Sequence, residues 1–171
     1  WGDILRAVPA ARLRFRYRTW FGNAGLRERI CRACGADVAA RIEFADPRES
    51  WSLGLYAEVD IALDPFPFAG AATTFDSLWM GVPIVTLVGE LVAGRQTAAM
   101  HANLGLQALC AEDVDAYVRI AERLASDLPY LRRLRRSLRS DLAASPLCDA
   151  ESFTRHLESA YRDLWQTRLT Q

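Results

Sequence analysis

Apolar residues follow two alternating patterns along this chain. Short apolar runs are typical of strands, and stretches with an apolar residue every three or four positions are typical of amphipathic helices. Strands are expected over 12–18, 41–45, 59–63, 84–87 and 106–110. Helices are expected over 24–35, 48–58, 73–81, 92–104, 112–126, 128–144 and 149–168. This alternation predicts an α/β fold, a parallel sheet with helices on both faces.

The stretch 59–85 has the clearest strand, loop, helix and strand succession. Its first strand stops at Asp64, and prolines and small residues follow as far as residue 72. A helix then opens at Thr73. Ligands of parallel sheets bind beyond the carboxyl ends of strands, and a helix N-terminus presents unpaired N–H groups. The stretch therefore predicts an anion site, with phosphate as its expected occupant.

Two helix-start residues of this stretch have a second interpretation. Thr73 as N-cap, with Asp76 three residues later, approximates a capping box. An acidic residue in the first helical turn is also favoured by the helix dipole. The residues alone favour this capping role, and a role in ligand binding is compatible with it.

Composition narrows the class of partner. The 171 residues correspond to one domain, with 51% hydrophobic and 25% charged residues, as in ordinary globular proteins. There are 21 basic and 21 acidic residues, which argues against a general nucleic-acid or membrane-surface binder. All basic residues are arginine, so any phosphate-binding lysine must come from outside this chain.

Arginines cluster along 12–18 and around the apolar stripe of 128–144. Either cluster suits an anion surface, but a solvated face is the usual meaning of such a run. Apolar residues at helical spacing precede Pro9, so the chain is expected to open inside a helix, as a piece of a longer polypeptide. No apolar run approaches the roughly 20 residues of a membrane span.

Cysteines and histidines give no catalytic or metal constellation. Cys31 and Cys34 lie three apart in a helical run without a second pair, so buried thiols are expected rather than a zinc site. Reduced cysteines predict a cytoplasmic protein. His101 and His156 fall in predicted helices away from the central stretch, and both are interpreted as structural.

Residues 60–87, DIALDPFPF-x-G-x-x-TT-x-D-x-LWMGVPIVTL, resemble the signature of the O-linked N-acetylglucosamine transferase family in its bacterial, SPINDLY-like form. The resemblance continues with W-x-x-IL-x-x-VP at 1–9, ASPL-x-DA-x-x-F at 144–153 and LE-x-AYRDLW at 157–165. It covers nearly the whole chain in the family's order.

The resemblance implies a fold and a domain organisation. Residues 1–171 would form one Rossmann-like nucleotide-sugar-binding domain, the C-terminal half of a GT-B glycosyltransferase, ending in a helical segment. The first strand of that domain is expected to be missing, together with the N-terminal catalytic half and its tetratricopeptide repeats. The family's diphosphate-binding lysine and acceptor pocket lie in that missing part. No catalytic residue is therefore assigned here, and this fragment alone is expected to be inactive.

The resemblance also assigns a nucleotide site. The diphosphate would lie at the helix start, the ribose hydroxyls at Asp76, and the base near the loop after strand 41–45. The residues implied are Gly70, Ala71, Ala72, Thr73, Thr74, Asp76, Ala45, Asp46 and Ser52. Arg95 matches a family arginine that either orients the loop 90–94 or lies near the donor. The family needs no metal and no other cofactor.

The implied reaction is inverting transfer of N-acetylglucosamine from UDP-GlcNAc to Ser or Thr of an acceptor protein. Alternatives are another donor, GDP-fucose or UDP-glucose, and a scaffold module that retains the fold without catalysis. The scaffold alternative rests on Ala71, Ala72 and Ser52, which stand where relatives carry polar or imidazole side chains.

Overall fold

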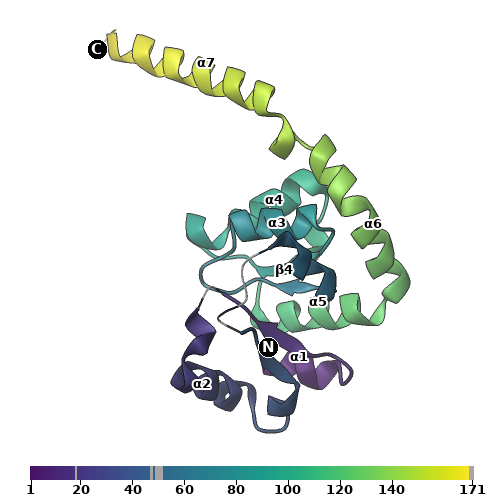
Figure 1. The fold of residues 1–171 in the computed structure, drawn as a ribbon. Coiled ribbons are helices and arrows are strands. Elements are labelled where there is room, and N and C mark those ends of the chain that lie inside the picture. The colour runs from purple at the N-terminus through teal and green to yellow at the C-terminus, as the bar shows by residue number, and fades with distance from the viewer. Residues whose placement is uncertain (18, 47, 49–51, 170–171) are drawn as a thin grey trace.

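The computed structural model describes residues 1–17, 19–46, 48 and 52–169 (Figure 1). Its strands are parallel and form two sheets. β1 (Leu13–Phe15) pairs with β2 (Ile42–Phe44) in one sheet. In the other, β4 (Ile84–Leu87) lies between β3 (Ala62–Leu63) and β5 (Cys110–Ala111). The predicted α/β class with parallel strands is confirmed, with the paired strands divided between two sheets.

Seven α-helices occur in the described residues: α1 (Gly2–Ala7), α2 (Ala24–Cys34), α3 (Ala72–Trp79), α4 (Gln96–Leu104), α5 (Val114–Ser126), α6 (Leu128–Ala144) and α7 (Ala150–Leu169). Between them lie the 3₁₀ turns η1 (Trp20–Gly22), η2 (Ala39–Arg41), η3 (Leu53–Glu58), η4 (Val92–Gly94), η5 (Gln107–Leu109) and η6 (Pro146–Cys148). Asp113 and Asp127 cap α5 and α6, each accepting a hydrogen bond from an amide in the first turn of its helix.

Four predicted elements take a different form. The helix expected over 48–58 is the 3₁₀ turn η3 in its described part, where Gly54 disfavours a regular helix; residues 49–51 lie outside the described residues. The expected strand 12–18 is paired only over β1, and residue 18 is also outside the described part.

The expected helix 92–104 divides into η4 and α4, because the Gly94 carbonyl turns back and accepts the Gly89 N–H at 3.0 Å. The expected strand 106–110 is mostly η5. Gly105 ends α4 in the left-handed conformation, with φ of 68°, and the chain needs one more turn before it pairs with β4.

Buried apolar side chains form two clusters of unequal size. The larger cluster has thirteen buried residues and joins β4 to α3, α5 and α6; Leu78, Val85 and Leu138 are among its most buried members. The smaller cluster has four, Leu5, Cys34, Val38 and Ile42, beneath β1 and β2. α1 links them, since Ile4 belongs to the larger cluster and Leu5 to the smaller.

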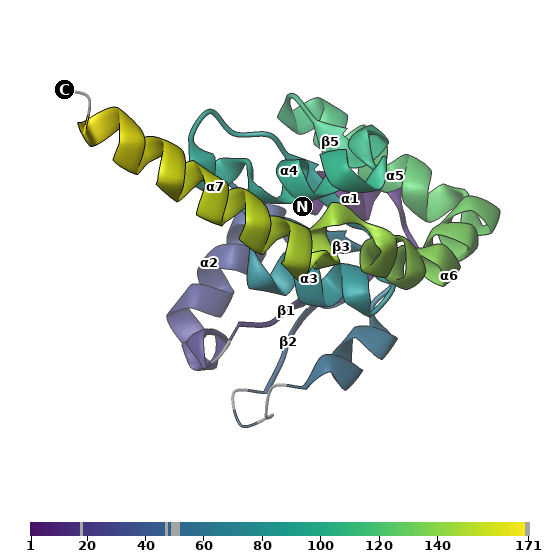
Figure 2. The same cartoon turned by 90° about the horizontal axis from the view of Figure 1, so that it is seen from above.

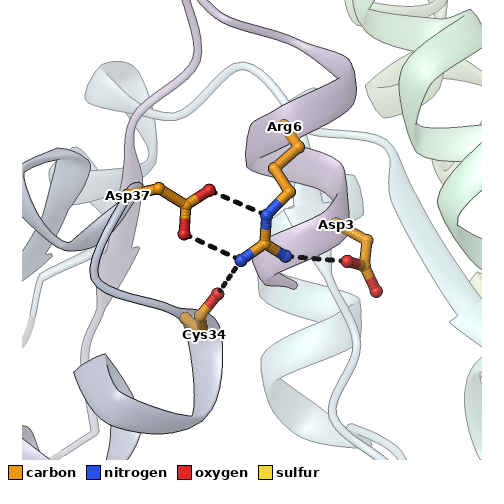
Figure 3. A network of polar contacts seen from close by, with 4 residues as sticks. All are labelled: Asp3, Arg6, Cys34 and Asp37. Atoms are coloured by element: carbon orange, nitrogen blue, oxygen red, sulfur yellow. Dashed lines mark hydrogen bonds and ion pairs between the residues drawn. The ribbon is translucent and has the colours of Figure 1, made fainter.

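Arg6 fastens α1 to the end of α2 (Figure 3). Its Nε and Nη2 donate to the two carboxylate oxygens of Asp37 at 2.8 and 2.9 Å, and Nη1 donates to Asp3 at 2.8 Å. Nη2 also donates to the Cys34 carbonyl at 2.8 Å, which satisfies a terminal carbonyl of α2. The Arg6 guanidinium lowers the pKa of the Asp37 carboxyl through these hydrogen bonds. Gly35, with φ of 108°, leaves the space that the guanidinium fills.

The clustered arginines largely contact the protein itself. Arg12 pairs with Glu43, and Arg14 pairs with Glu58 at 2.5 Å. From α6, Arg135 donates to the Val59 and Asp60 carbonyls just before β3. These contacts favour the structural interpretation of both clusters over an anion-binding surface.

The last helix, α7, projects away from the rest of the molecule (Figures 1 and 2). None of its residues over 150–169 is buried. Its apolar side chains are exposed along one stripe: Phe153, Leu157, Tyr161, Leu164, Trp165 and Leu169. Among the described helices, neither α7 nor any other combines the length and the apolarity that crossing a bilayer requires.

Candidate functional site

The candidate site begins where β3 ends. Asp64 follows β3 and is buried, with 4% of its surface exposed. Its N–H donates to the Val85 carbonyl of β4 at 2.9 Å. Its carboxylate accepts hydrogen bonds from the Gly70 N–H and from the Thr86 hydroxyl, each at 2.7 Å. The loop 65–69 is therefore closed at its base by a buried side chain.

Gly70 occupies a position that no larger residue fits. A Cβ on Gly70 would lie 2.4 Å from the Thr74 hydroxyl oxygen. Its carbonyl accepts a hydrogen bond from the Thr97 hydroxyl at 3.3 Å. The Thr97 oxygen also lies 2.9 Å from the Thr74 oxygen, and since Thr97 uses its proton on Gly70, Thr74 is the donor of this pair. Both peptide groups of Gly70 are thus held in place.

The N-terminus of α3 offers backbone donors. Its N-cap is Ala71, whose side chain cannot cap, so the N–H groups of residues 71–74 have no intrahelical partner. These donors and the helix dipole suit an anion. The Gly70 N–H does not belong to this set, because Asp64 accepts it. Of the two predicted hydroxyls, Thr73 is exposed, whereas Thr74 is buried and bonded to Thr97.

The capping interpretation of Thr73 and Asp76 is wrong. The helix begins at Ala72, so Thr73 is its second residue and Asp76 its fifth, and the first turn contains no acidic residue. The hydrogen bonds that hold Gly70 make Ala71 the N-cap, two residues before Thr73, which the capping interpretation had placed there. Asp76 is half-buried, and its side chain does not cap the start of the helix.

Tyr56 is a neighbour of the site that the sequence did not single out. It comes from η3, and its hydroxyl donates to the Thr73 carbonyl at 3.1 Å. Burial, with a contribution from the negative charge of Asp76, raises the pKa of Tyr56 to about 12. Its phenol therefore stays protonated at neutral pH and keeps donating this hydrogen bond. Tyr56 lies eight residues before Asp64 in the sequence, and no local sequence pattern predicts its contact with Thr73.

The residues predicted to meet the base come from the other sheet and from η3. Ala45 is buried after β2, and its N–H donates to the Phe15 carbonyl at 2.9 Å, which extends the β1–β2 pairing. Asp46 accepts hydrogen bonds from the backbone and guanidinium of Arg48, which hold the pKa of its carboxyl well below the usual range. Ser52 is exposed at the start of η3, and its side chain makes no capping bond.

Arg95 and His101 have structural contacts. Arg95 is exposed, and its Nη1 donates to the Gly89 carbonyl at 3.2 Å, which supports the loop-orienting alternative. His101 is fully buried in α4, with Nδ1 3.5 Å from the Cys110 sulfur, and burial lowers the pKa of His101 to about 4. His156 is exposed on α7.

All four cysteines are free, and Cys34 is buried as predicted. Within the described residues, no three His, Cys, Asp or Glu side chains gather closely enough to hold a metal.

Comparisons with known proteins show which family the chain resembles. The family model of glycosyl transferase family 41 matches residues 1–157. The chain is 40% identical over 176 residues to the probable UDP-N-acetylglucosamine–peptide N-acetylglucosaminyltransferase SPINDLY of Petunia hybrida, covering 97% of this chain and 18% of that protein. The UDP-N-acetylglucosamine–peptide N-acetylglucosaminyltransferase of Caenorhabditis elegans is 31% identical over 172 residues, with 97% and 14% covered.

A solved structure extends the likeness to the fold. A mutant of the Thermobaculum terrenum O-GlcNAc transferase superposes with a TM-score of 0.87 at 39% identity. The match covers 98% of this chain and 32% of that protein, so the chain spans a small part of each relative. It confirms the predicted fold class, the C-terminal domain of a GT-B enzyme. Since the family model matches most of the chain, this protein belongs to glycosyltransferase family 41.

Proposed function

We propose that this chain is the donor-binding part of a glycosyltransferase that moves N-acetylglucosamine from UDP-GlcNAc to Ser or Thr of an acceptor protein, with inversion. The observation that carries the proposal is the N-terminus of α3, where four unpaired N–H groups follow a glycine turn at the carboxyl end of a parallel strand. The names of the relatives, which describe peptide N-acetylglucosaminyltransferases, support the same activity.

The diphosphate of the donor would accept hydrogen bonds from the N–H groups of residues 71–74. As the glycosidic bond breaks, negative charge grows on the leaving diphosphate, and fixed amides with an aligned helix dipole stabilise that charge. The chain contains no lysine, so the diphosphate-binding lysine that the family resemblance implies would come from another part of the protein. We extend the proposal to a reaction that needs no metal, since these donors meet the leaving charge directly.

The nucleoside would lie between the two sheets' carboxyl ends. Asp76 is the group proposed to accept hydrogen bonds from the ribose hydroxyls, because it is half-buried and free of any capping role. Ala45, Asp46 and Ser52 are proposed to face the base. Ala71 and Ala72 remove side-chain contacts but leave their N–H groups, so the principal phosphate donors do not depend on side chains. This supports donor binding over the scaffold alternative.

The proposal includes a longer polypeptide. The common doubly wound order places the first strand between the second strand and the fourth. Here β1 and β3 belong to separate sheets, and Trp1 contacts both Phe15 of β1 and Phe66 beyond β3, with ring centroids 5.2 and 6.4 Å apart. A strand from the remainder of the polypeptide, pairing between β1 and β3, would join the sheets.

Acceptor-binding and catalytic groups, and tetratricopeptide repeats, are proposed to lie in that remainder of the polypeptide. The four free cysteines support a cytoplasmic location.

Calorimetry on the full-length protein tests the proposal. UDP and UDP-GlcNAc are expected to bind, and a nucleotide at 100 times its Kd stabilises the fold by about 2.7 kcal/mol. UDP-glucose, GDP and GDP-fucose serve as comparison ligands, and mass spectrometry of a Ser/Thr acceptor peptide detects transfer. A folded protein that binds none of these nucleotides would support the scaffold alternative, and preferential binding of GDP-fucose would change the donor.

A further inference from the structure

We infer that Asp64 is a positioning residue for the donor diphosphate: it holds the Gly70 turn in the geometry that aims the α3 amides outward, without touching the donor. This inference rests on the proposed function and adds a residue to it. Asp64 has 4% of its surface exposed, and its two carboxylate oxygens bond in different directions. One accepts the Gly70 N–H and the other accepts the Thr86 hydroxyl of β4, each at 2.7 Å.

The Gly70 turn needs such a restraint. Residues 65–69 form a loop of prolines and small or aromatic residues between the strand end and Gly70. The loop is tied elsewhere by the Ala69 N–H, which donates to the Ala93 carbonyl at 2.9 Å. Asp64 fixes the peptide before Gly70, and Thr97 fixes the peptide after it. The orientation of these two peptides sets the direction of the Ala71 N–H and of the helix start.

The backbone of Asp64 is itself anchored by two hydrogen bonds. Its N–H bonds to Val85 of β4 at 2.9 Å, and its carbonyl accepts the Tyr117 hydroxyl of α5 at 2.9 Å. Tyr117 is 1% exposed, and its hydroxyl in turn accepts the Trp1 indole N–H at 3.4 Å. Burial raises the pKa of Tyr117, so the hydroxyl stays protonated and keeps donating. The restraint on Gly70 is thus connected to β4, α5 and the start of α1.

This position requires a side chain with two polar atoms, one an oxygen that accepts the Gly70 N–H and the other a hydrogen-bond partner for the Thr86 hydroxyl. Both partners of the Asp64 carboxylate donate to it. A backbone N–H such as that of Gly70 can only donate, and the buried Thr86 hydroxyl points its proton at the second carboxylate oxygen. Asn offers one oxygen to Gly70, while Thr86 turns its hydroxyl to accept from the amide nitrogen. Asn therefore keeps the geometry, whereas Ala leaves the Gly70 N–H without its partner and the turn without its restraint.

The test compares Asp64→Ala, Asp64→Asn and Leu138→Ala in the full-length protein. Leu138 is a buried α6 residue outside the turn, and its substitution controls for lost stability. The inference expects Asp64→Ala to weaken UDP binding by about tenfold or more, the scale of one lost charge-assisted hydrogen bond. Asp64→Asn should restore most of the affinity, and Leu138→Ala should bind UDP like the parent at a temperature where it is folded.

Hydrogen exchange supplies a readout that needs no nucleotide. Asp64→Ala should accelerate exchange in the peptide that carries the first turn of α3, and Leu138→Ala should not. If Asp64→Ala fails to fold, Asp64→Glu replaces it, because the extra methylene displaces the carboxylate from the Gly70 amide while keeping its charge. A folded Asp64→Ala or Asp64→Glu protein with unchanged affinity and exchange overturns the inference. A parent protein that binds no UDP contradicts the proposed function instead, and the exchange comparison then decides on Asp64 alone.

Discussion

The two sheets differ in how firmly they hold the residues that face the proposed donor. β3, β4 and β5 rest on thirteen buried residues, and the Gly70 turn beside them is held by buried hydrogen bonds. β1 and β2 rest on four buried residues. Among the residues that the structure describes beyond them, Asp46 bonds to the exposed Arg48, and the Ser52 side chain makes no capping bond. The side proposed to bind phosphate is thus built into the core, whereas the side proposed to bind the base is built on the surface. Substitutions that alter the choice of base therefore cost the fold less than substitutions that alter phosphate binding.

The test with the largest expected effect on stability is a matched pair of core substitutions, one in each cluster. Leu138 and Leu5 are almost equally buried, at 1% and 2% exposed, but belong to the larger and the smaller cluster. Leu138→Ala should cost about 4 kcal/mol of unfolding free energy, and Leu5→Ala about 2 kcal/mol, because the smaller cluster can relax into the cavity. Urea denaturation measures both. Equal losses would mean that the two sheets are equally well supported.

Acid should weaken the larger region through His101. Its pKa is about 4 in the folded protein against about 6.5 in an unfolded chain, so the unfolded state binds more protons between these values. Stability present above pH 6.5 is therefore lost as the pH falls, by about 3 kcal/mol at pH 4 and below. His101→Gln removes this contribution, and the difference between parent and variant in urea denaturation at pH 7 and pH 5 isolates it from the carboxyl groups. Parallel pH profiles would show that His101 is not responsible.

Asp76→Asn probes the proposed ribose contact. Losing the charge should weaken UDP binding about ten- to a hundredfold, since about 1.4 kcal/mol corresponds to one decade. Stability should change by less than about 0.5 kcal/mol, because Asp76 lies in the second turn and caps nothing. Calorimetry and thermal melting on the same samples give both quantities. A variant that melts lower but binds UDP like the parent would remove Asp76 from the site.

Tyr56→Phe should have a smaller effect. It removes the 3.1 Å hydrogen bond to the Thr73 carbonyl while keeping the ring against α3. A loss of about 1 kcal/mol in stability, and at most about a fivefold loss in UDP affinity, is expected from one neutral hydrogen bond. Tyr56→Leu is the control for the ring itself. A larger loss of affinity than Asp76→Asn causes would move Tyr56 from a supporting position to a direct contact.

The smallest expected effect is that of chelation. The amides of residues 71–74 are proposed to meet the diphosphate charge, so EDTA should leave glycosyl transfer by the full-length protein unchanged. Transfer assays with EDTA, and with manganese added back, measure this. Loss of activity with EDTA and recovery with manganese would show that a metal shares the role of α3.

The sequence-based prediction was strongest where periodicity and local capping agree. α5 and α6 were expected to within about two residues, because an apolar stripe runs through each and an aspartate caps each. The start of α3 was misplaced because Thr73 is the better N-cap by local chemistry, while Asp64 and Thr97 hold Gly70 and move the start to Ala72. The strand expected over 106–110 is mostly the 3₁₀ turn η5, because a short apolar run alone does not distinguish a strand from a turn.

Asp64 and Tyr56 show why part of the site could not be predicted. Asp64 acts on Gly70, six residues away, and on Thr86, 22 residues away, and only the folded chain brings these three together. Tyr56 meets Thr73 across 17 residues in the same way. The turn that is proposed to bind the diphosphate was recognisable as a turn before a helix, because a small-residue loop followed by a helix start is a local pattern. Its supporting side chains are set by tertiary contacts, which no spacing rule encodes.

The projecting helix α7 gives this protein a built-in optical reporter. The protein has four cysteines, all of which lie in the described residues, and among them only Cys148 is exposed. Cys148 lies two residues before the start of α7. A helix of 20 residues is about 30 Å long, so a dye on that thiol, just before the helix, and the indole of Trp165 near its far end form a donor–acceptor pair. Trp165 is 65% exposed, so its emission would shift to shorter wavelength when a surface covers the helix. Contact between α7 and the rest of the full-length protein can thus be followed by fluorescence in solution.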